Sequence, residues 1–240
     1  DAGVQVMALT DHDTTAGHAE AAQRSRARGV HFVPGIELTT YAHGRVIHVL
    51  GLGINATNPQ LEAANATALA VWDANQRRWI DALSRSGVNL SFERDFADHP
   101  VRLPVLIERL CKKGLEGGDP VKVHGRFKKF FAELSNEAYH GLPSPGGAAG
   151  IIREAGGVAL LAHPDPLREA HLIDELLESF DGLEALYMPY SDVQREALRS
   201  LAVQRDKLYS CGSDYHGYFV ADYRRPTCEA PEALLRRLGL

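Results

Sequence analysis

The sequence predicts an α/β fold in which a barrel of parallel strands is interrupted by a helical insertion. Short apolar runs alternate with amphipathic helical segments over residues 1–57 and again over residues 141–240, and this alternation is typical of βα units. Residues 58–140 instead show helical spacing, Ala-rich over 58–86, without a strand pattern. We therefore expect a discontinuous barrel domain, 1–57 and 141–240, and a helical insertion subdomain, 58–140.

Each element follows from its own local pattern. Before the insertion, apolar runs and one amphipathic stretch predict a strand, a helix and two further strands at 4–9, 15–28, 32–38 and 46–53. Gly29 follows the first helix, in the position that favours a left-handed residue. Helical spacing within the insertion predicts helices at 58–86, 104–113 and 125–134. After Pro143-Ser144-Pro145 we expect helices at 146–155, 172–180 and 192–205 and strands at 158–162, 183–186 and 208–212.

Composition limits the class of protein. A chain of 240 residues with 45% hydrophobic residues and a formal charge of −5 can bury a large core. The mild acidity argues against a dedicated DNA-coating protein, and we expect no membrane partner because no apolar run is long enough to span one. Cys111, Cys211 and Cys228 are few and far apart, so we expect reduced thiols in a cytoplasmic protein rather than a disulfide framework.

The most informative stretch is the strand-to-helix turn that carries Asp11, His12 and Asp13. Chemistry in α/β proteins is concentrated at the carboxyl ends of strands. Asp13 has an alternative interpretation as a cap of the following helix, for which Asp is well suited. His12 gains little from packing between two carboxylates, so a functional role is favoured for it.

Further His and carboxylate residues follow other apolar strands. Glu37, His163, Asp214 and His216 come at predicted strand ends, and His48 lies inside a strand. His48 alone would more often be a hydrogen-bonded core residue than a ligand. A parallel barrel would bring the strand ends to one mouth, however, and imidazoles mixed with carboxylates suit Mn, Fe, Zn or Mg. We expect two or three divalent ions, which activate water and neutralise phosphoryl oxygens in hydrolysis.

The insertion gathers basic residues between Arg102 and Lys129 against few acidic ones. One interpretation is a solvated helix face. The other is a site for an anionic substrate, because a local positive excess on an acidic protein attracts anions. Arg102, Lys128 and the later His140 are the candidate substrate-binding residues.

Five ordered motifs resemble the PHP (polymerase and histidinol phosphatase) phosphoesterases: Thr10-Asp11-His12-Asp13-Thr14, Pro34-Gly35-Ile36-Glu37, Ile47-His48-Val49-Leu50-Gly51, Leu161-Ala162-His163-Pro164 and Gly212-Ser213-Asp214-Tyr215-His216. The resemblance is strongest to the branch with 3′,5′-nucleoside bisphosphate phosphatases and 5′-to-3′ exoribonucleases. It implies a distorted (β/α)7 barrel with a trinuclear metal site. The implied metal ligands are His12, Glu37, His48, His163, Asp214 and His216.

The chain departs from the family pattern at three places. The family's opening strand with His-x-His has no counterpart here, and we expect it to precede residue 1. Relatives resemble Gly-Arg-Pro-His in the insertion, where this chain has Val101-Arg102-Leu103-Pro104-Val105, and the basic residue after an Ala-Tyr pair is replaced by the candidate His140.

The predicted function is hydrolysis of a phosphate ester of a nucleotide or a 5′-phosphorylated RNA end. His163, Asp214 and His216 are the expected catalytic residues, with either histidine placed to aid proton movement while serving mainly as a ligand. Two alternatives stay open: a histidinol-phosphate or other small phosphomonoesterase, and a degenerate domain that binds a nucleotide or a partner without turnover. The oligomeric state is not predicted.

Overall fold

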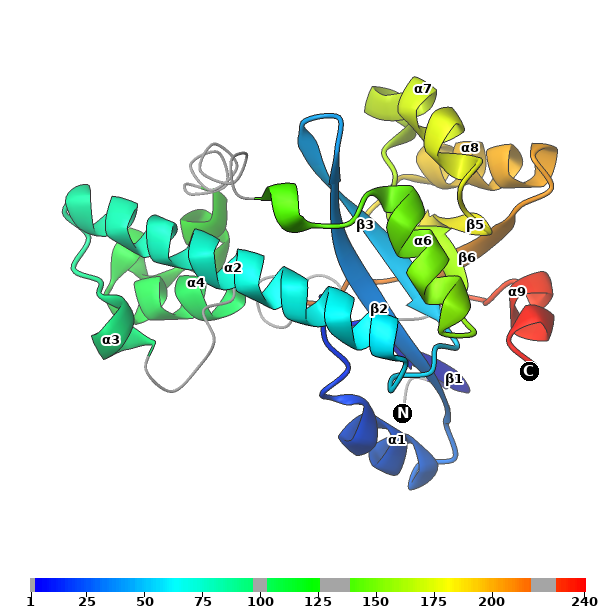
Figure 1. The fold of residues 1–240 in the computed structure, drawn as a ribbon, viewed down its shortest axis with the longest axis horizontal. Coiled ribbons are helices and arrows are strands. Elements are labelled where there is room, and N and C mark those ends of the chain that lie inside the picture. The colour runs from blue at the N-terminus through cyan, green and yellow to red at the C-terminus, as the bar shows by residue number, and fades with distance from the viewer. Residues whose placement is uncertain (1–2, 97–102, 126–138, 217–227) are drawn as a thin grey trace. The chain divides into compact units, whose positions relative to one another are not determined.

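The computed structural model describes residues 3–96, 103–125, 139–216 and 228–240 (Figure 1). These residues form an α/β protein with two compact units. The first unit comprises Asp1–Ala66, Leu142–Asp214 and Tyr223–Leu240, and the second comprises Thr67–Gly141 and Tyr215–Asp222. The described parts of the first unit contain a mixed sheet of six strands, and those of the second are helical.

The six strands pair in their order along the chain: β1 (Val6–Leu9), β2 (His31–Ala42), β3 (Arg45–Leu52), β4 (Val158–Leu161), β5 (Gly182–Tyr187) and β6 (Leu208–Gly212). β1 is parallel to β2, and β4, β5 and β6 are parallel to one another. β3 runs antiparallel to both of its neighbours. The prediction of an all-parallel barrel was therefore wrong at β3.

A two-residue turn explains the direction of β3. His43 and Gly44 connect β2 to β3, and both have positive φ, 52° and 73°. Such a turn matches the twist of paired antiparallel strands, whereas a parallel connection needs about a dozen residues or more. The hairpin also extends β2 to Ala42, four residues beyond the expected end. Glu37 consequently lies inside β2 rather than at a strand end.

The helices of the first unit largely follow the predictions, except that two begin at other residues than expected and the C-terminal helix was not predicted. They are α1 (His18–Arg26), the start of α2 (Pro59–Arg85), α6 (Pro145–Glu154), α7 (Pro166–Leu177), α8 (Asp192–Gln204) and α9 (Glu232–Arg237). α1 begins at His18 with Gly17 as its N-cap, so Thr15 does not start it. α7 begins six residues earlier than expected, at Pro166, because proline fits the first turn of a helix.

Alternation along the strands separates the sheet into two apolar faces. Ile36 and Leu38 of β2 belong to a core cluster with residues of α6, α7 and α8. Val33 of β2 belongs to another cluster, with Leu50 of β3 and Leu234 of α9. Because successive side chains of a strand point to opposite faces, Glu37 and Thr39 share the face of Val33. Glu37 and Thr39 therefore point away from the face covered by α6, α7 and α8.

The second unit has its own core. Its described helical elements besides the rest of α2 are α3 (Phe92–Asp95), α4 (Leu103–Lys112), η1 (Leu115–Gly118) and η2 (Tyr139–Gly141). Trp79 is 3% exposed and clusters with Leu83 and with Leu106 and Leu110 of α4. Trp79 is thus a core residue of this unit. The helix expected at 125–134 lies largely outside the described residues.

The cysteine prediction was wrong for two of the three residues. Cys211 and Cys228 form a disulfide, and Cys111 is free. The bond joins the end of β6 to the segment before α9. Leu208 of β6 and Leu238 just after α9 pack against the apolar cluster that contains Leu234 of α9. Sequence separation could not reveal this proximity, which results from the return of the C-terminal helix to the sheet. No helix in the described part of the chain is long and apolar enough to cross a membrane.

Candidate metal centre

The turn after β1 continues the pairing with β2 beyond the end of the strand. The Glu37 backbone N–H donates to the Asp11 carbonyl at 3.1 Å, and the Asp13 N–H donates to the Glu37 carbonyl at 3.0 Å. His12 thereby forms an isolated parallel bridge with Glu37. Main-chain pairing rather than the start of a helix places the His12 side chain next to the Glu37 carboxylate.

Asp13 anchors this turn from inside the protein. It is fully buried and has a φ of 52°, a left-handed conformation that Asp tolerates better than most residues. Its Oδ1 accepts the Thr39 backbone N–H at 2.8 Å, and its Oδ2 accepts the Thr39 hydroxyl at 2.7 Å. Asp13 is therefore not the cap of α1, whose N-cap is Gly17. It ties the turn that carries His12 to the middle of β2.

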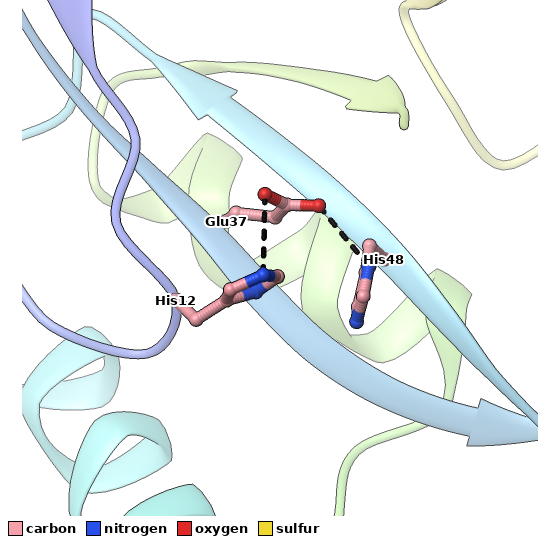
Figure 2. Close-up of side chains that lie close together, drawn as sticks. All are labelled: His12, Glu37 and His48. Atoms are coloured by element: carbon pink, nitrogen blue, oxygen red, sulfur yellow. Dashed lines mark ion pairs between the residues drawn. The ribbon is translucent and has the colours of Figure 1, made fainter. Parts of the chain in front are cut away.

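Histidines from three segments surround the Glu37 carboxylate. The His12 Nε2 lies 3.8 Å from Oε2, and the His48 Nδ1 lies 3.1 Å from Oε1. Figure 2 shows these two rings approaching the carboxylate from the turn after β1 and from β3. The His163 Nε2 lies 3.0 Å from Oε1 and 3.4 Å from the His48 Nδ1.

Strand register explains why His48 belongs to this group although it does not end a strand. His48 lies opposite Thr39 in the antiparallel β2–β3 pair, and Thr39 is two residues from Glu37. All three side chains therefore lie on one face of the sheet. His163 follows β4, which pairs with β3, and the Ala162 N–H donates to the His48 carbonyl at 3.1 Å. Neighbouring strands thus deliver both imidazoles to the same carboxylate.

Electrostatics link the group tightly. Burial alone would raise the pKa of Glu37, but the charges of His12 and His48 and the hydrogen bonds to the imidazoles outweigh burial and hold that pKa well below its usual value. Burial lowers the pKa of His163, yet the hydrogen bond to Glu37 and the nearby carboxylates raise it to about 9. Without a bound cation, the carboxylate is thus ionised and the His163 imidazole is protonated at neutral pH.

The donor atoms fit a divalent transition metal. His12, Glu37 and His48 each offer one ligand atom, and these atoms lie within 4.8 Å of one another. A mixture of imidazole and carboxylate ligands suits Mn, Fe or Zn. A cation would also replace the proton of His163 as the positive partner of Glu37, since bound metal displaces protons from its ligands. The residues therefore fit at least one such ion.

The structure locates only some of the other predicted site residues. The Asp214 carboxylate accepts the Tyr187 hydroxyl at 2.8 Å, and it is among the charges that raise the pKa of His163. His216 belongs to the second unit and stays a sequence prediction. Arg102 and Lys128 lie outside the described residues, as does the side chain of His140, whose backbone is in η2.

Three described lysines in the basic stretch of the insertion are paired with acids. Lys112 forms an ion pair with Glu108 one turn before it, and Lys113 lies 3.1 Å from Asp95. Lys122 lies 3.7 Å from Asp119. These three lysines fit the interpretation as a solvated helix face, so a phosphate-binding role would fall to other basic residues of the insertion.

Sequence reasoning named Asp13 but missed its role as an anchor of the turn. It missed three supporting polar residues altogether: Glu184 of β5, and Tyr187 and Tyr190 at and after the end of β5. Glu184 is 4% exposed, and burial raises its pKa to about 7. The sequence contained one indication of Glu184: a Glu within the apolar run 183–186 is unusual. A buried carboxylate needs polar partners, so its presence in a strand suggests a specific role.

An α/β fold with convergent imidazole and carboxylate donors defines a metal-dependent hydrolase. The chain belongs to the PHP-type metal-dependent phosphoesterases, as relatives at 30% identity or above show over most of their length. No family model matches the chain.

Three relatives are informative. The phosphoribosyl 1,2-cyclic phosphate 1,2-diphosphodiesterase of Eggerthella lenta is 30% identical over 90% of this chain and 85% of its own length. The 3′,5′-nucleoside bisphosphate phosphatase of Chromobacterium violaceum is 31% identical over 88% and 76%. A 5′-3′ exoribonuclease of Haemophilus influenzae is 29% identical over 89% and 80%. Among solved structures, an amidohydrolase from Chromobacterium violaceum with bound sulfate and no metal matches with a TM-score of 0.80 at 26% identity, over 98% of this chain and 86% of that one.

Proposed function

We propose that this protein hydrolyses a phosphate ester of a nucleotide, either a 3′,5′-nucleoside bisphosphate or a 5′-phosphorylated RNA end. One observation carries the proposal: ligand atoms of His12, Glu37 and His48 lie within 4.8 Å of one another. The His163 Nε2 lies 3.0 Å from the same Glu37 carboxylate. Relatives that act on nucleoside bisphosphates and RNA support this substrate class.

The proposed ligands are His12, Glu37, His48, His163, Asp214 and His216, for two or three divalent ions. When bound, such ions lower the pKa of water and neutralise phosphoryl oxygens. Glu37 would be the central residue of this set, since imidazoles lie near both of its oxygens. We also propose that the mixed sheet forms part of a distorted (β/α)7 barrel over 1–57 and 141–240, with 58–140 as its insertion.

The protein's own residues prepare the site in defined ways. Hydrogen bonds from Thr39 to Asp13 hold the turn that carries His12. The Tyr187 hydroxyl donates to Asp214 and so fixes the direction of that carboxylate. His163 holds a proton against Glu37 until a cation binds and takes the place of that proton. Arg102, Lys128 and His140 remain the proposed contacts to substrate phosphate.

A substrate panel tests the proposal. The purified chain, loaded with Mn²⁺, would be offered 3′-phosphoadenosine 5′-phosphate, a 5′-phosphorylated oligoribonucleotide, a ribose cyclic phosphodiester and histidinol phosphate. We expect Mn²⁺-dependent product release from one of the first two substrates. Glu37→Gln should abolish it, because this change removes the central anionic ligand, whereas Glu20→Gln changes an exposed carboxylate paired with Arg24 and should have no effect.

Other results would select a different function. Cleavage of the cyclic diester alone would favour the activity of the Eggerthella lenta relative, and cleavage of histidinol phosphate alone would favour a small phosphomonoesterase. Mn²⁺ binding without cleavage of any substrate would contradict the proposal and support a non-catalytic binding domain.

A further inference from the structure

β5 contributes no proposed metal ligand, yet it lies between β4 and β6, whose ends carry His163 and Asp214. Three polar side chains from β5 and the turn after it reach those two ends: Glu184, Tyr187 and Tyr190. β5 is therefore placed to hold two neighbouring ligand-bearing segments in one arrangement.

His163 needs such support because its backbone is unusual. Its φ is 29°, outside the regions that non-glycine residues normally adopt, so this conformation persists only where the surroundings hold it. The Glu184 Oε2 accepts the His163 backbone N–H at 3.1 Å. The Tyr190 hydroxyl donates to the His163 carbonyl at 2.7 Å. Side chains from the β5 region thus hold both polar backbone groups of His163.

The same carboxylate also reaches the end of β6. A Cβ atom added to Gly212 would lie 2.1 Å from the Glu184 Oε1, so the carboxylate occupies the space that a side chain at position 212 would need. Asp214, two residues later, has a φ of 49° and accepts the Tyr187 hydroxyl. Glu184 therefore touches the β4 end through a hydrogen bond and the β6 end through direct packing.

Local irregularity and burial both distinguish Glu184 from an ordinary strand residue. The β5–β6 register shifts between Glu184 and Leu186, and such bulges bend a strand and redirect side chains, often next to active sites. Burying a carboxylate among other carboxylates opposes folding. The contacts of the Glu184 carboxylate with the ends of β4 and β6 therefore explain its presence better than a contribution to folding stability does.

We propose that Glu184 is a positioning residue that fixes the ends of β4 and β6, and with them His163 and Asp214, in the arrangement that binds divalent cations. This inference rests on the proposed metal site. Residues that orient metal ligands typically change metal affinity by about 10- to 100-fold when they are removed.

The test compares Mn²⁺ affinity in four forms of the full chain: wild type, Glu184→Ala, Glu184→Gln and Asp181→Ala. Free Mn²⁺ is measured by electron paramagnetic resonance, and folding by circular dichroism and thermal melting. Asp181 is the matched control. Its Oδ2 accepts the backbone N–H of Ala159 in β4 at 2.8 Å, so it also binds β4, but at the strand end remote from His163.

We expect Glu184→Ala to weaken Mn²⁺ binding by about tenfold or more without a lower melting temperature. Glu184→Gln should restore most of the affinity, because its amide oxygen can still accept the His163 N–H. Asp181→Ala should lower the melting temperature and leave Mn²⁺ affinity unchanged.

Two results would overturn the inference: equal Mn²⁺ affinity of Glu184→Ala and wild type, or an equal loss of affinity in Asp181→Ala. Wild-type protein that binds no Mn²⁺ would overturn the metal site and this inference together. Wild-type protein that binds Mn²⁺ but hydrolyses no phosphate ester would contradict the proposed function alone, since the positioning role is decided by the affinities.

Discussion

Thr39→Val isolates the hydrogen bond that ties the His12 turn to β2. The change removes the hydroxyl that donates to the Asp13 Oδ2 at 2.7 Å, and it keeps the backbone N–H that donates to Oδ1. Both residues are buried, with exposures of 1% and 0%, so water cannot replace the lost donor. A hydrogen bond to a charged group contributes about 1.5–3 kcal/mol, which is the expected loss of unfolding free energy.

Thr40→Val is the matched control. Thr40 is the next residue of β2, is also fully buried, and donates its hydroxyl to the neutral Ile47 carbonyl at 2.5 Å. A neutral hydrogen bond contributes about 0.5–1.5 kcal/mol, so this variant should lose about half as much stability. Only Thr39→Val should also weaken Mn²⁺ binding, because only Thr39 holds the turn that carries His12.

Urea unfolding followed by circular dichroism and Mn²⁺ titration would be run on both variants. Equal stability losses in Thr39→Val and Thr40→Val would refute the special contribution of the charged acceptor. Mn²⁺ affinity at the wild-type level in Thr39→Val would refute the link between Asp13 and the position of His12.

Three other predictions concern charge, covalent linkage and substrate contact. The raised pKa of His163 stabilises metal-free protein fully below about pH 6.5, and this contribution is lost as pH rises to about 9. The melting temperatures of wild type and His163→Gln should therefore converge over this pH range. Melting temperatures that stay equally far apart would contradict this prediction. Replacing Cys211 and Cys228 by serine should cost about 3 kcal/mol of unfolding free energy for a loop of this length, measured in urea, and an unchanged midpoint would exclude the cross-link in solution. Arg102→Ala should raise KM for a nucleoside bisphosphate by an amount equivalent to about 1.5–3 kcal/mol. Lys112→Ala, which removes a lysine paired with Glu108, should leave KM unchanged. Equal KM values for wild type and Arg102→Ala would show that Arg102 does not contact the substrate.

Local patterns were enough to predict most elements, and the expected convergence of strand ends together with the family resemblance indicated the candidate site residues. The apolar run at 158–162 and the Ser-capped segment after residue 191 became β4 and α8 nearly as expected. His12, Glu37, His48 and His163 were among six residues expected at one metal site, and the structure brings these four together at one carboxylate. Local sequence predicts such elements because periodicity and caps act within a few residues.

The features that depend on distant segments could not be predicted. The pairing of β3 with β4 depends on a strand that follows the whole helical insertion. The disulfide depends on where the C-terminal segment packs against β6. The role of Asp13 depends on Thr39, which is 26 residues away. In each case tertiary contacts rather than local propensity decide the outcome.

The most direct test of the metal centre is anomalous diffraction at the manganese edge from crystals grown with Mn²⁺. We expect a peak about 2.0–2.3 Å from a Glu37 carboxylate oxygen, with nitrogen atoms of His12 or His48 completing the coordination of the ion. Manganese bound only elsewhere, with Glu37 still hydrogen-bonded to the imidazoles of His48 and His163, would contradict it.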